Sequence, residues 1–267
     1  FRKFKTDNYH SGDSMAESYP HFLKGVKVLP GEIGIIEALP KQGKTTALVN
    51  LGVLFLLHGH RVYHWSLEIP NREPNYQVFN RYSARILGKD MNQITGKDIQ
   101  VAIKKVNLMG GDLVVKDDPY VTLKDVRGWA SKGKPTVLIV DYADLIISQT
   151  KVKEGRFQIR ETYMALRNLA KELNIPLITA SQSDIKGKKK AIIDIENLEE
   201  AKIVKAGMCS WIVSLNQTPE EAEDGLMRCF VVLSTHGVKA PLRKCEVDFS
   251  KQLIKEIRRE GDSDGKV

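Results

Sequence analysis

Short apolar runs alternate with helical segments over the first two thirds of the chain. The apolar runs, each short enough for one buried strand, lie at 33–37, 61–66, 113–115, 136–141 and 176–180. The segments between them place apolar residues at helical spacing, at 44–58, 71–87, 97–108, 123–131 and 161–173. This alternation predicts an α/β fold, in which a mostly parallel, doubly wound central sheet is flanked by helices.

The last third of the chain has a different pattern. Three further strands are predicted, at 210–215, 227–234 and 243–248, and little helix separates them. They are therefore expected to form an antiparallel C-terminal extension on one edge of the sheet. Residues 218–221, Thr-Pro-Glu-Glu, predict a turn or a short capped helix between the first two of these strands. A helix is also predicted near 198–206.

Polar segments suggest how the chain is divided. Residues 148–160 and 183–197 are predicted loops. Residues 1–28 are expected to be an arm or linker and 258–267 a charged tail, which leaves 29–257 as one domain. Because the first residue is phenylalanine rather than methionine, the sequence is expected to be a fragment from which an upstream domain is missing.

Composition narrows the class of protein. The chain has 267 residues, of which 42% are hydrophobic, enough for one large α/β domain with a sizeable core. No apolar run is long enough for a transmembrane helix. The three cysteines do not form a CxxC pair, which favours buried thiols in a reducing cytosol over a zinc site or disulfides. The net charge of +8 permits nucleic-acid binding without proving it.

One stretch between the first predicted strand and the first predicted helix has the layout of a phosphate-binding loop. It is residues 38–46, Ala-Leu-Pro-Lys-Gln-Gly-Lys-Thr-Thr. Backbone N–H groups at the helix start would face a phosphate, whose negative charge the helix dipole favours. Lys44 would supply a positive charge to the β- and γ-phosphates, and the hydroxyl of Thr45 would bind Mg²⁺. The first glycine of the usual pattern is replaced by Ala38.

The phosphate loop therefore predicts a binding site for a nucleoside triphosphate with Mg²⁺. The residues expected to contact the nucleotide are Ala38, Pro40, Lys41, Gln42, Gly43, Lys44, Thr45 and Thr46.

Three more polar residues follow predicted strands, where ligands of open α/β sheets bind. Asp141 comes after four apolar residues and is interpreted as the acid that holds Mg²⁺ through water; the alternative is a helix cap or a solvated loop acid. Asp144 is a poorer candidate. Glu68 could polarise the water that attacks the γ-phosphate, or it could be a first-turn helix acid. Gln182 could sense the γ-phosphate, or it could satisfy buried backbone groups.

Five short motifs occur in order along the chain. They are Pro30-Gly31-Glu32, Ala38-x-Pro40-x-x-Gly43-Lys44-Thr45, Ser66-Leu67-Glu68-Ile69-Pro70, Val140-Asp141-Tyr142-x-x-Leu145-Ile146 and Ser181-Gln182. Together they resemble the motifs of the DnaB-type replicative helicases, which are hexameric motors with a RecA-like ATPase domain. The resemblance covers residues 29–250, and the phage members of the family are especially similar. Alanine at the position of Ala38 is common in that family.

The resemblance implies an ATP-hydrolysing DNA helicase that acts as a hexameric ring on single-stranded DNA, in the cytoplasm of a bacterial or phage-infected cell. A primase or a helicase loader would be a partner of such a ring. By this resemblance, Glu68 would be the catalytic base and Lys44 the lysine that binds the phosphates. Thr45 and Asp141 would be the Mg²⁺ ligands. Gln182 would couple hydrolysis to movement. ATP and Mg²⁺ are the cofactors that it implies.

The same resemblance places the loops after 146 and after 182 at the central channel, where they would grip single-stranded DNA; the segment 195–201 also overlaps the DNA-binding region of the family. Four lysines of the second loop suit that role electrostatically, because phosphate contacts dominate such binding. They are Lys186, Lys188, Lys189 and Lys190. The alternative is an ordinary solvated surface loop.

One motif of the family is missing. A Lys-x-Arg-x-Gly sequence on a late strand normally reaches the nucleotide of the neighbouring subunit, and this chain has Ser234-Thr235-His236-Gly237 there. Such an arginine can contribute several orders of magnitude to turnover. Three basic residues nearby could substitute, and His236 could do so weakly; the three are Lys239, Arg243 and Arg228.

The missing motif leaves two alternatives to a helicase motor open. One is a scaffold that binds ATP and DNA or a replication partner but hydrolyses little. The other is a RecA- or KaiC-like ATPase that is not a helicase, which the match of Ser66-Leu67-Glu68-Ile69-Pro70 to the helicase pattern disfavours.

Overall fold

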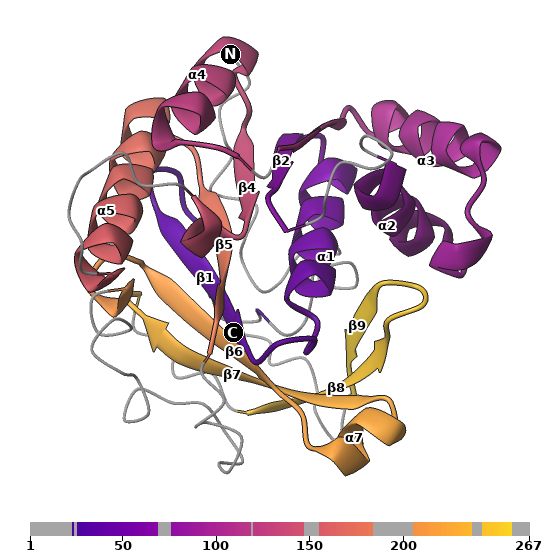
Figure 1. The fold of residues 1–267 in the computed structure, drawn as a ribbon. Coiled ribbons are helices and arrows are strands. Elements are labelled where there is room, and N and C mark those ends of the chain that lie inside the picture. The colour runs from indigo at the N-terminus through magenta and orange to yellow at the C-terminus, as the bar shows by residue number, and fades with distance from the viewer. Residues whose placement is uncertain are drawn as a thin grey trace, which may run out of the picture.

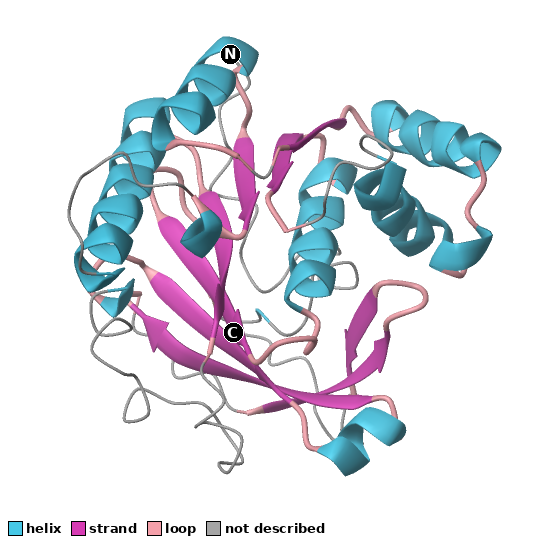
Figure 2. Cartoon of the chain, viewed as in Figure 1, coloured by secondary structure: helices cyan, strands magenta, loops and turns pink. Residues whose placement is uncertain are grey.

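The computed structural model describes residues 23, 26–68, 76–118, 120–146, 155–183, 205–236 and 242–257. Within these residues, nine strands form one twisted sheet in the order β3-β2-β4-β5-β1-β6-β7-β8-β9 (Figures 1 and 2). The strands are β1 Ile33–Ala38, β2 Arg61–Ser66, β3 Asp112–Asp117, β4 Val137–Asp141, β5 Leu177–Gln182, β6 Trp211–Asn216, β7 Leu226–Ser234, β8 Arg243–Asp248 and β9 Leu253–Glu256. The predicted α/β class is confirmed.

The neighbouring strands β3, β2, β4, β5, β1 and β6 are parallel to one another. The strands β7, β8 and β9 continue the sheet beyond β6 with antiparallel pairing. The strand predicted at 210–215, β6, was expected to be antiparallel, but it pairs parallel to β1 on one side and antiparallel to β7 on the other, so the antiparallel extension begins at β7. The chain between β5 and β6 is long enough for a parallel crossover, which needs roughly a dozen residues. The ninth strand, β9, was not predicted.

Helices cover both faces of the sheet (Figure 1). They are α1 Lys44–Leu57, α2 Tyr76–Leu87, α3 Gly96–Leu108, α4 Leu123–Gly133, α5 Gly155–Leu173 and α7 Pro219–Glu223, with short 3-10 turns η4 Met91–Gln93 and η5 Ala143–Leu145. Helices α1, α2 and α3 lie on one side, and α4 and α5 lie on the other. A sheet buried on both faces explains why its strands are continuously apolar.

Alternate residues of β1 face the two halves of the core. Ile33 and Ile35 pack with α4 and α5, whereas Ile36 and Ala38 pack with α1 and α2. The pairing of β1 with β6 requires Gly34, because a Cβ there would lie 2.0 Å from the ring of the buried Trp211.

Local signals set the starts of several helices. Thr95, Thr122 and Thr218 each form a capping box at the start of α3, α4 and α7. By contrast, α5 begins at Gly155, inside the segment 148–160 that was predicted as a loop. The first turns of α5 contain two apolar residues, Phe157 and Ile159, among polar and basic ones, and the regular apolar spacing by which the helix was recognised begins at Tyr163.

The cysteines at positions 209, 229 and 245 are buried thiols, as expected. No helix in the described ranges combines the length and the apolar character needed to cross a membrane. The arm at 1–28 and the tail at 258–267 lie almost wholly outside the described residues, and the helix predicted near 198–206 is described only at its last two residues, which are helical.

Candidate nucleotide-binding site

The phosphate loop has the predicted strand–loop–helix layout. It leaves β1 at Ala38 and enters α1 at Lys44, and Gly43 between them has a left-handed backbone with φ 82°. A Cβ at Gly43 would lie 2.7 Å from Cε1 of Phe249, so glycine satisfies both the conformation and the close packing. No side chain caps the start of α1 and no acid lies in its first turn, so its backbone N–H groups suit an anionic ligand.

Asp141 and Thr45 form the polar centre of the site. The Thr45 hydroxyl donates a hydrogen bond to Asp141 Oδ2 at 2.7 Å. Asp141 is fully buried at the end of β4, and its Oδ1 atom has no hydrogen-bond partner among the described residues. A buried carboxylate with one oxygen unpaired beside a hydroxyl is a donor set that suits Mg²⁺. The residues expected to hold the metal are therefore in contact, and their chemistry fits the group.

The pKa of Asp141 is raised to about 6, chiefly by burial and to a smaller extent by the negative charge of Glu68. The hydrogen bond from Thr45 and the positive charges of Arg81 and Lys44 oppose that rise. The positive charges around Asp141 are thus too weak to keep its pKa at the ordinary value. A bound cation would stabilise the ionised form of this carboxyl group, as is typical of a metal ligand.

Lys44 and Glu68 lie at the same edge of the sheet. Lys44 is 6% exposed, and burial lowers its pKa, against the raising effect of Glu68, Asp141 and Asp144. Glu68 is exposed after the end of β2, where the preceding Leu67 N–H donates to the Asp141 backbone oxygen at 2.7 Å. The phosphate-loop lysine and the two candidate acids are therefore brought together as predicted.

Gln182 occupies the end of β5, opposite Ala38 of the phosphate loop in the register of the two strands. Its side chain is exposed. The next residue, Ser183, donates from its backbone N–H to Ala38 O at 3.0 Å and from its hydroxyl to the buried Glu37 at 2.7 Å. These contacts fix Gln182 beside the phosphate loop, where a γ-phosphate sensor would be required. The alternative role for Gln182, that of a buried residue that hydrogen-bonds backbone groups, does not fit its exposed side chain.

Sequence reasoning missed Arg81 on α2. Its Nη1 donates to Gln252 Oε1 at 3.0 Å, and its Nε atom has no hydrogen-bond partner in the described part of the chain. Burial lowers the pKa of Arg81, and the charges of Asp141 and Glu68 act against that shift, which places this cation near both acids. The available signal was two arginines, Arg81 and Arg85, spaced i and i+4 within the helical segment predicted at 71–87.

The turn between β8 and β9 packs on the phosphate loop and α1. Gln252 in this turn is 2% exposed and accepts a hydrogen bond from the Thr46 hydroxyl at 3.1 Å. Asn50 donates to the Gln252 backbone oxygen at 2.7 Å, and Arg85 donates to Asn50 Oδ1 at 2.7 Å. The C-terminal strands therefore support the nucleotide site directly.

The basic residues considered for a neighbouring subunit's site have partners in their own chain. His236 Nε2 lies 2.9 Å from Glu32 Oε1, and Arg228 Nε lies 2.7 Å from Glu221 Oε1. Arg243 forms an ion pair with Glu256. Lys239 lies outside the described residues. The role of all four basic residues towards another subunit stays a prediction.

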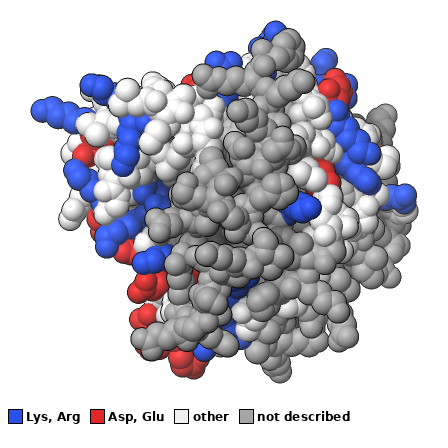
Figure 3. Space-filling model, turned by 180° about the vertical axis from the view of Figure 1, so that it is seen from behind, with Lys and Arg blue, Asp and Glu red and all other residues white. Residues whose placement is uncertain are grey.

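The four lysines predicted to contact DNA also lie outside the described residues, as does the segment 195–201. On the face shown in Figure 3, the basic side chains of described residues fall in groups towards the two sides, and some of them have acidic neighbours.

A family model for the DnaB-like helicase C terminal domain matches residues 19–191, more than half of the chain. The replicative DNA helicase DnaB of Buchnera aphidicola subsp. Schizaphis graminum is 31% identical over 169 residues, which cover 57% of this chain and 35% of that protein. The chain thus spans about a third of the length of the curated relatives that it matches.

Two solved structures share the fold. The ATPase domain of G40P has a TM-score of 0.73 at 13% identity, covering 86% of each chain. The structure of a DnaB-like replicative helicase and its interactions with primase has a TM-score of 0.73 at 14% identity, covering 86% of this chain and 58% of that one. Both confirm the RecA-like fold, and the family match confirms the resemblance of the motifs. The chain belongs to the family of DnaB-like helicase C-terminal domains.

Proposed function

We propose that the chain is the motor of an ATP-driven replicative DNA helicase, which works as a hexameric ring and couples ATP hydrolysis to movement along single-stranded DNA. The observation that carries this proposal is the hydrogen bond from Thr45 to Asp141, made at the strand end that Lys44 and Glu68 also approach. Such a set of residues suits phosphoryl transfer, in which positioning and charge stabilisation provide most of the catalysis.

Each residue has a distinct part in this reaction. Lys44 and the backbone N–H groups at the start of α1 bind the phosphates and offset their negative charge. Thr45 and Asp141 would hold Mg²⁺, which when bound supplies charge neutralisation at the phosphates. Glu68 is exposed and accepts the proton of the attacking water. Gln182, at the end of β5, senses the γ-phosphate.

The DNA-binding role is assigned to the segment that follows Gln182. Its lysines 186, 188, 189 and 190 supply positive charge for the phosphate backbone of single-stranded DNA. A solved relative in this family is described with primase, and a primase or a helicase loader is proposed as a partner of the ring here.

A second candidate function is a nucleotide-gated scaffold with little turnover. It is favoured by the contacts of Arg228, Arg243 and His236, each of which has an acidic partner within its own chain. A residue that completes the site of a neighbouring subunit would have to leave that partner.

The test is ATP turnover by the full chain with and without single-stranded DNA. The wild type is expected to show DNA-stimulated hydrolysis, and Lys44→Ala and Glu68→Gln are expected to abolish it. Glu68→Gln should still bind ATP, since it lacks only the base. Tight ATP binding by the wild type without any DNA-stimulated turnover would refute the motor and favour the scaffold.

A further inference from the structure

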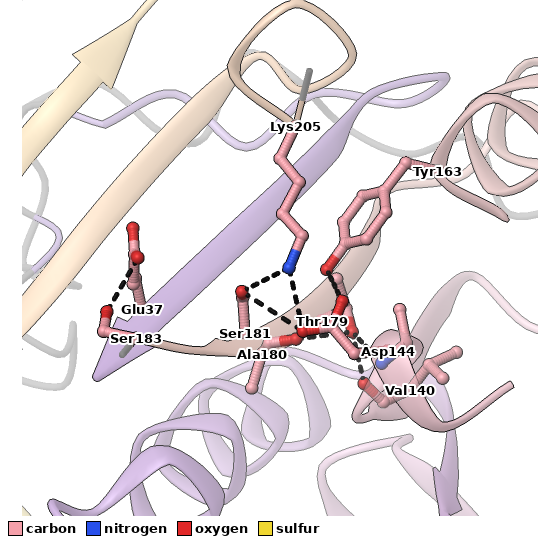
Figure 4. Close-up of polar contacts among 10 residues, drawn as sticks. Glu37, Val140, Asp144, Tyr163, Thr179, Ala180, Ser181, Ser183 and Lys205 are labelled. Carbon is pink, nitrogen blue, oxygen red and sulfur yellow. Dashed lines mark hydrogen bonds and ion pairs between the residues drawn. The ribbon is translucent and has the colours of Figure 1, made fainter. Parts of the chain in front are cut away.

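Two lysines among the described residues are almost fully buried, and their surroundings differ. Both Lys44 and Lys205 are 6% exposed. The ammonium group of Lys205 donates to Asp144 Oδ2 and to Ser181 Oγ, both at 2.8 Å (Figure 4). The ammonium group of Lys44 has no hydrogen bond or ion pair with any described residue. Because a buried cation is costly without a partner, Lys44 has to be held by a contact of another kind.

The ring of Tyr142 provides that contact. The Nζ atom of Lys44 lies 5.7 Å from the centroid of this ring. At such a distance the negative face of an aromatic ring attracts a cation. Tyr142 directly follows Asp141 at the end of β4, and its side chain packs on the same half of the core as α1, the helix that begins at Lys44. The ring and the phosphate loop therefore meet at the Lys44 ammonium group.

The backbone on both sides of Tyr142 is held by neighbouring strands. Before it, the Asp141 backbone oxygen accepts a hydrogen bond from the Leu67 N–H at 2.7 Å. After it, the Ala143 N–H donates to the Thr179 hydroxyl at 2.9 Å. Thr179 lies in β5 and Leu67 follows β2, so the strands on either side of β4 together fix the place from which the Tyr142 ring projects.

Three acids act on Lys44 through their charge without bonding to it. Burial lowers the pKa of Lys44, and Glu68, Asp141 and Asp144 oppose that shift. Asp144 accepts a hydrogen bond from Lys205 instead. Asp141 retains an oxygen, Oδ1, that has no partner among the described residues. Lys44 is thus held close to an available carboxylate oxygen and yet apart from it.

An aromatic face suits a lysine that has to bind phosphate. The ammonium group has three N–H donors, and a ring attracts the cation without bringing a negative charge that would repel the ligand. A carboxylate partner would occupy a donor and add such a charge. The ring also restricts the long side chain before the ligand arrives, which lowers the entropy lost on binding.

We propose that Tyr142 is a positioning residue that holds the Lys44 ammonium group over its ring, apart from Asp141 and directed to the phosphates of a nucleotide. This inference rests on the proposed function, in which Lys44 binds those phosphates. Without the ring, the ammonium group would pair with Oδ1 of Asp141 and compete there with Mg²⁺. Tyr142 therefore acts through Lys44 and needs no contact of its own with the nucleotide.

The first test is the affinity of the full chain for a fluorescent non-hydrolysable ATP analogue with Mg²⁺. Tyr142→Phe keeps the ring and should bind within about 2-fold of the wild type. Tyr142→Leu removes the ring and should bind about 2- to 30-fold more weakly, the range that a contact between a cation and a ring provides. Tyr142→Met replaces Tyr142→Leu if the latter does not fold.

A double substitution shows whether Tyr142 acts through Lys44. In a Lys44→Met background, Tyr142→Leu should weaken binding by about 2-fold or less, because no cation remains for the ring to hold. Lys116→Met is the matched control. The Lys116 Nζ atom lies 4.3 Å from the centroid of the Trp65 ring, on strand β3, which β2, β4 and β5 separate from β1. Removing that cation should leave the affinity unchanged.

A second readout needs no nucleotide. In protein labelled with ¹³C at the ε-carbon of lysine, the ring current of Tyr142 should displace the Lys44 resonance from those of exposed lysines, and Lys44→Arg identifies it by its disappearance. Tyr142→Phe should retain the displacement. Tyr142→Leu should move the resonance towards those of exposed lysines.

The outcomes separate this inference from the function on which it rests. Tyr142→Leu with wild-type affinity overturns the inference, as does an equal loss in the Lys44→Met background. Tyr142→Phe as weak as Tyr142→Leu also overturns it, because the hydroxyl rather than the ring would then matter. A wild type that does not bind the analogue refutes the proposed function. In that case, or if Lys44→Met binds too weakly to measure, the Lys44 resonance decides, and one that Tyr142→Leu leaves unmoved overturns the inference.

Discussion

At the scale of single residues, Asp141 and Asp144 show how burial and partners decide the role of an acid. Asp141 is fully buried and has one hydroxyl partner, so it retains an oxygen for a cation. Asp144 is saturated by Lys205, Tyr163 and Ser181. The side chains around these two carboxylates therefore leave only Asp141 with an oxygen that a cation could bind.

Asp141→Asn is expected to weaken Mg²⁺-dependent nucleotide binding by about 10- to 100-fold, because an amide replaces the carboxylate in the metal's shell. The measurement is the affinity for a fluorescent ATP analogue in Mg²⁺ and in EDTA. The wild type should lose affinity in EDTA, and Asp141→Asn should be insensitive to it. Asp144→Asn is the matched control and should keep the Mg²⁺ dependence; equal effects of the two substitutions would contradict the assignment.

His64 makes the stability of the chain sensitive to acid. It is fully buried in β2, and burial lowers its pKa to about 3, with a smaller effect of Arg81 in the same direction. The unfolded chain protonates this histidine below about pH 6.5 and the folded chain does not, so stability present above that pH is lost as the pH falls towards 3.

The slope due to His64 approaches about 1.4 kcal/mol per pH unit in this window. His64→Gln retains a polar group for Tyr82 but cannot be protonated, so its free energy of unfolding should fall less steeply between pH 6 and pH 4. Urea unfolding at several pH values measures the difference. Parallel curves for the wild type and His64→Gln would rule out His64 as the source.

At the scale of elements, the β8–β9 turn is a support for the phosphate loop. Phe249 packs on Gly43, and Gln252 bonds Thr46 of α1 and Arg81 of α2. The antiparallel strands thus do more than extend the sheet, because they place buried hydrogen-bonding groups behind the site.

Gln252→Ala is expected to cost about 2–3 kcal/mol in the free energy of unfolding, because it leaves buried donors of Thr46 and Arg81 unpaired. Lys251→Ala is a matched control in the same turn, since its ion pair with Asp248 is largely exposed to solvent and contributes little to stability. Urea unfolding compares the two. A Gln252→Ala variant as stable as Lys251→Ala would show that the hydrogen bonds of this turn do not hold the site.

Local sequence signals predicted most helices and strands but not the contacts between residues that are distant in the sequence. Continuous apolar runs identified the central strands, and apolar residues at helical spacing identified α3 and α4, because these signals lie within a few residues. The direction of β6 depends on its pairing with β1, and β9 is short and half charged, so neither has a local signature. Arg81 and Lys205 were missed for the same reason, since their partners lie in distant segments.

At the scale of the whole molecule, the parallel strands place the phosphate loop, Glu68, Asp141 and Gln182 at one edge of the sheet, as the motifs predicted. In the ring proposed here, the second half of each nucleotide site would come from a neighbouring subunit. His236, Arg228 and Arg243 are the described basic candidates, and all three are paired within the chain. Their use therefore depends on assembly.

Ring formation follows from the proposed function. With Mg²⁺ and a non-hydrolysable ATP analogue, the full-length protein should form a closed hexamer by mass photometry, because the nucleotide would sit between subunits. Lys44→Ala should assemble less at the same protein concentration. A protein that stays monomeric with both nucleotide and DNA would contradict the ring and leave the shared site without a partner.

The most direct test of the central claim is strand displacement by the full-length protein on a forked DNA substrate. The wild type is expected to separate the strands when ATP and Mg²⁺ are supplied, and Glu68→Gln is expected to bind the fork and ATP without separating them. A wild type that hydrolyses ATP without displacing a strand, or a Glu68→Gln variant that displaces it at the wild-type rate, would contradict the assignment of an ATP-driven motor built around Lys44, Glu68 and Asp141.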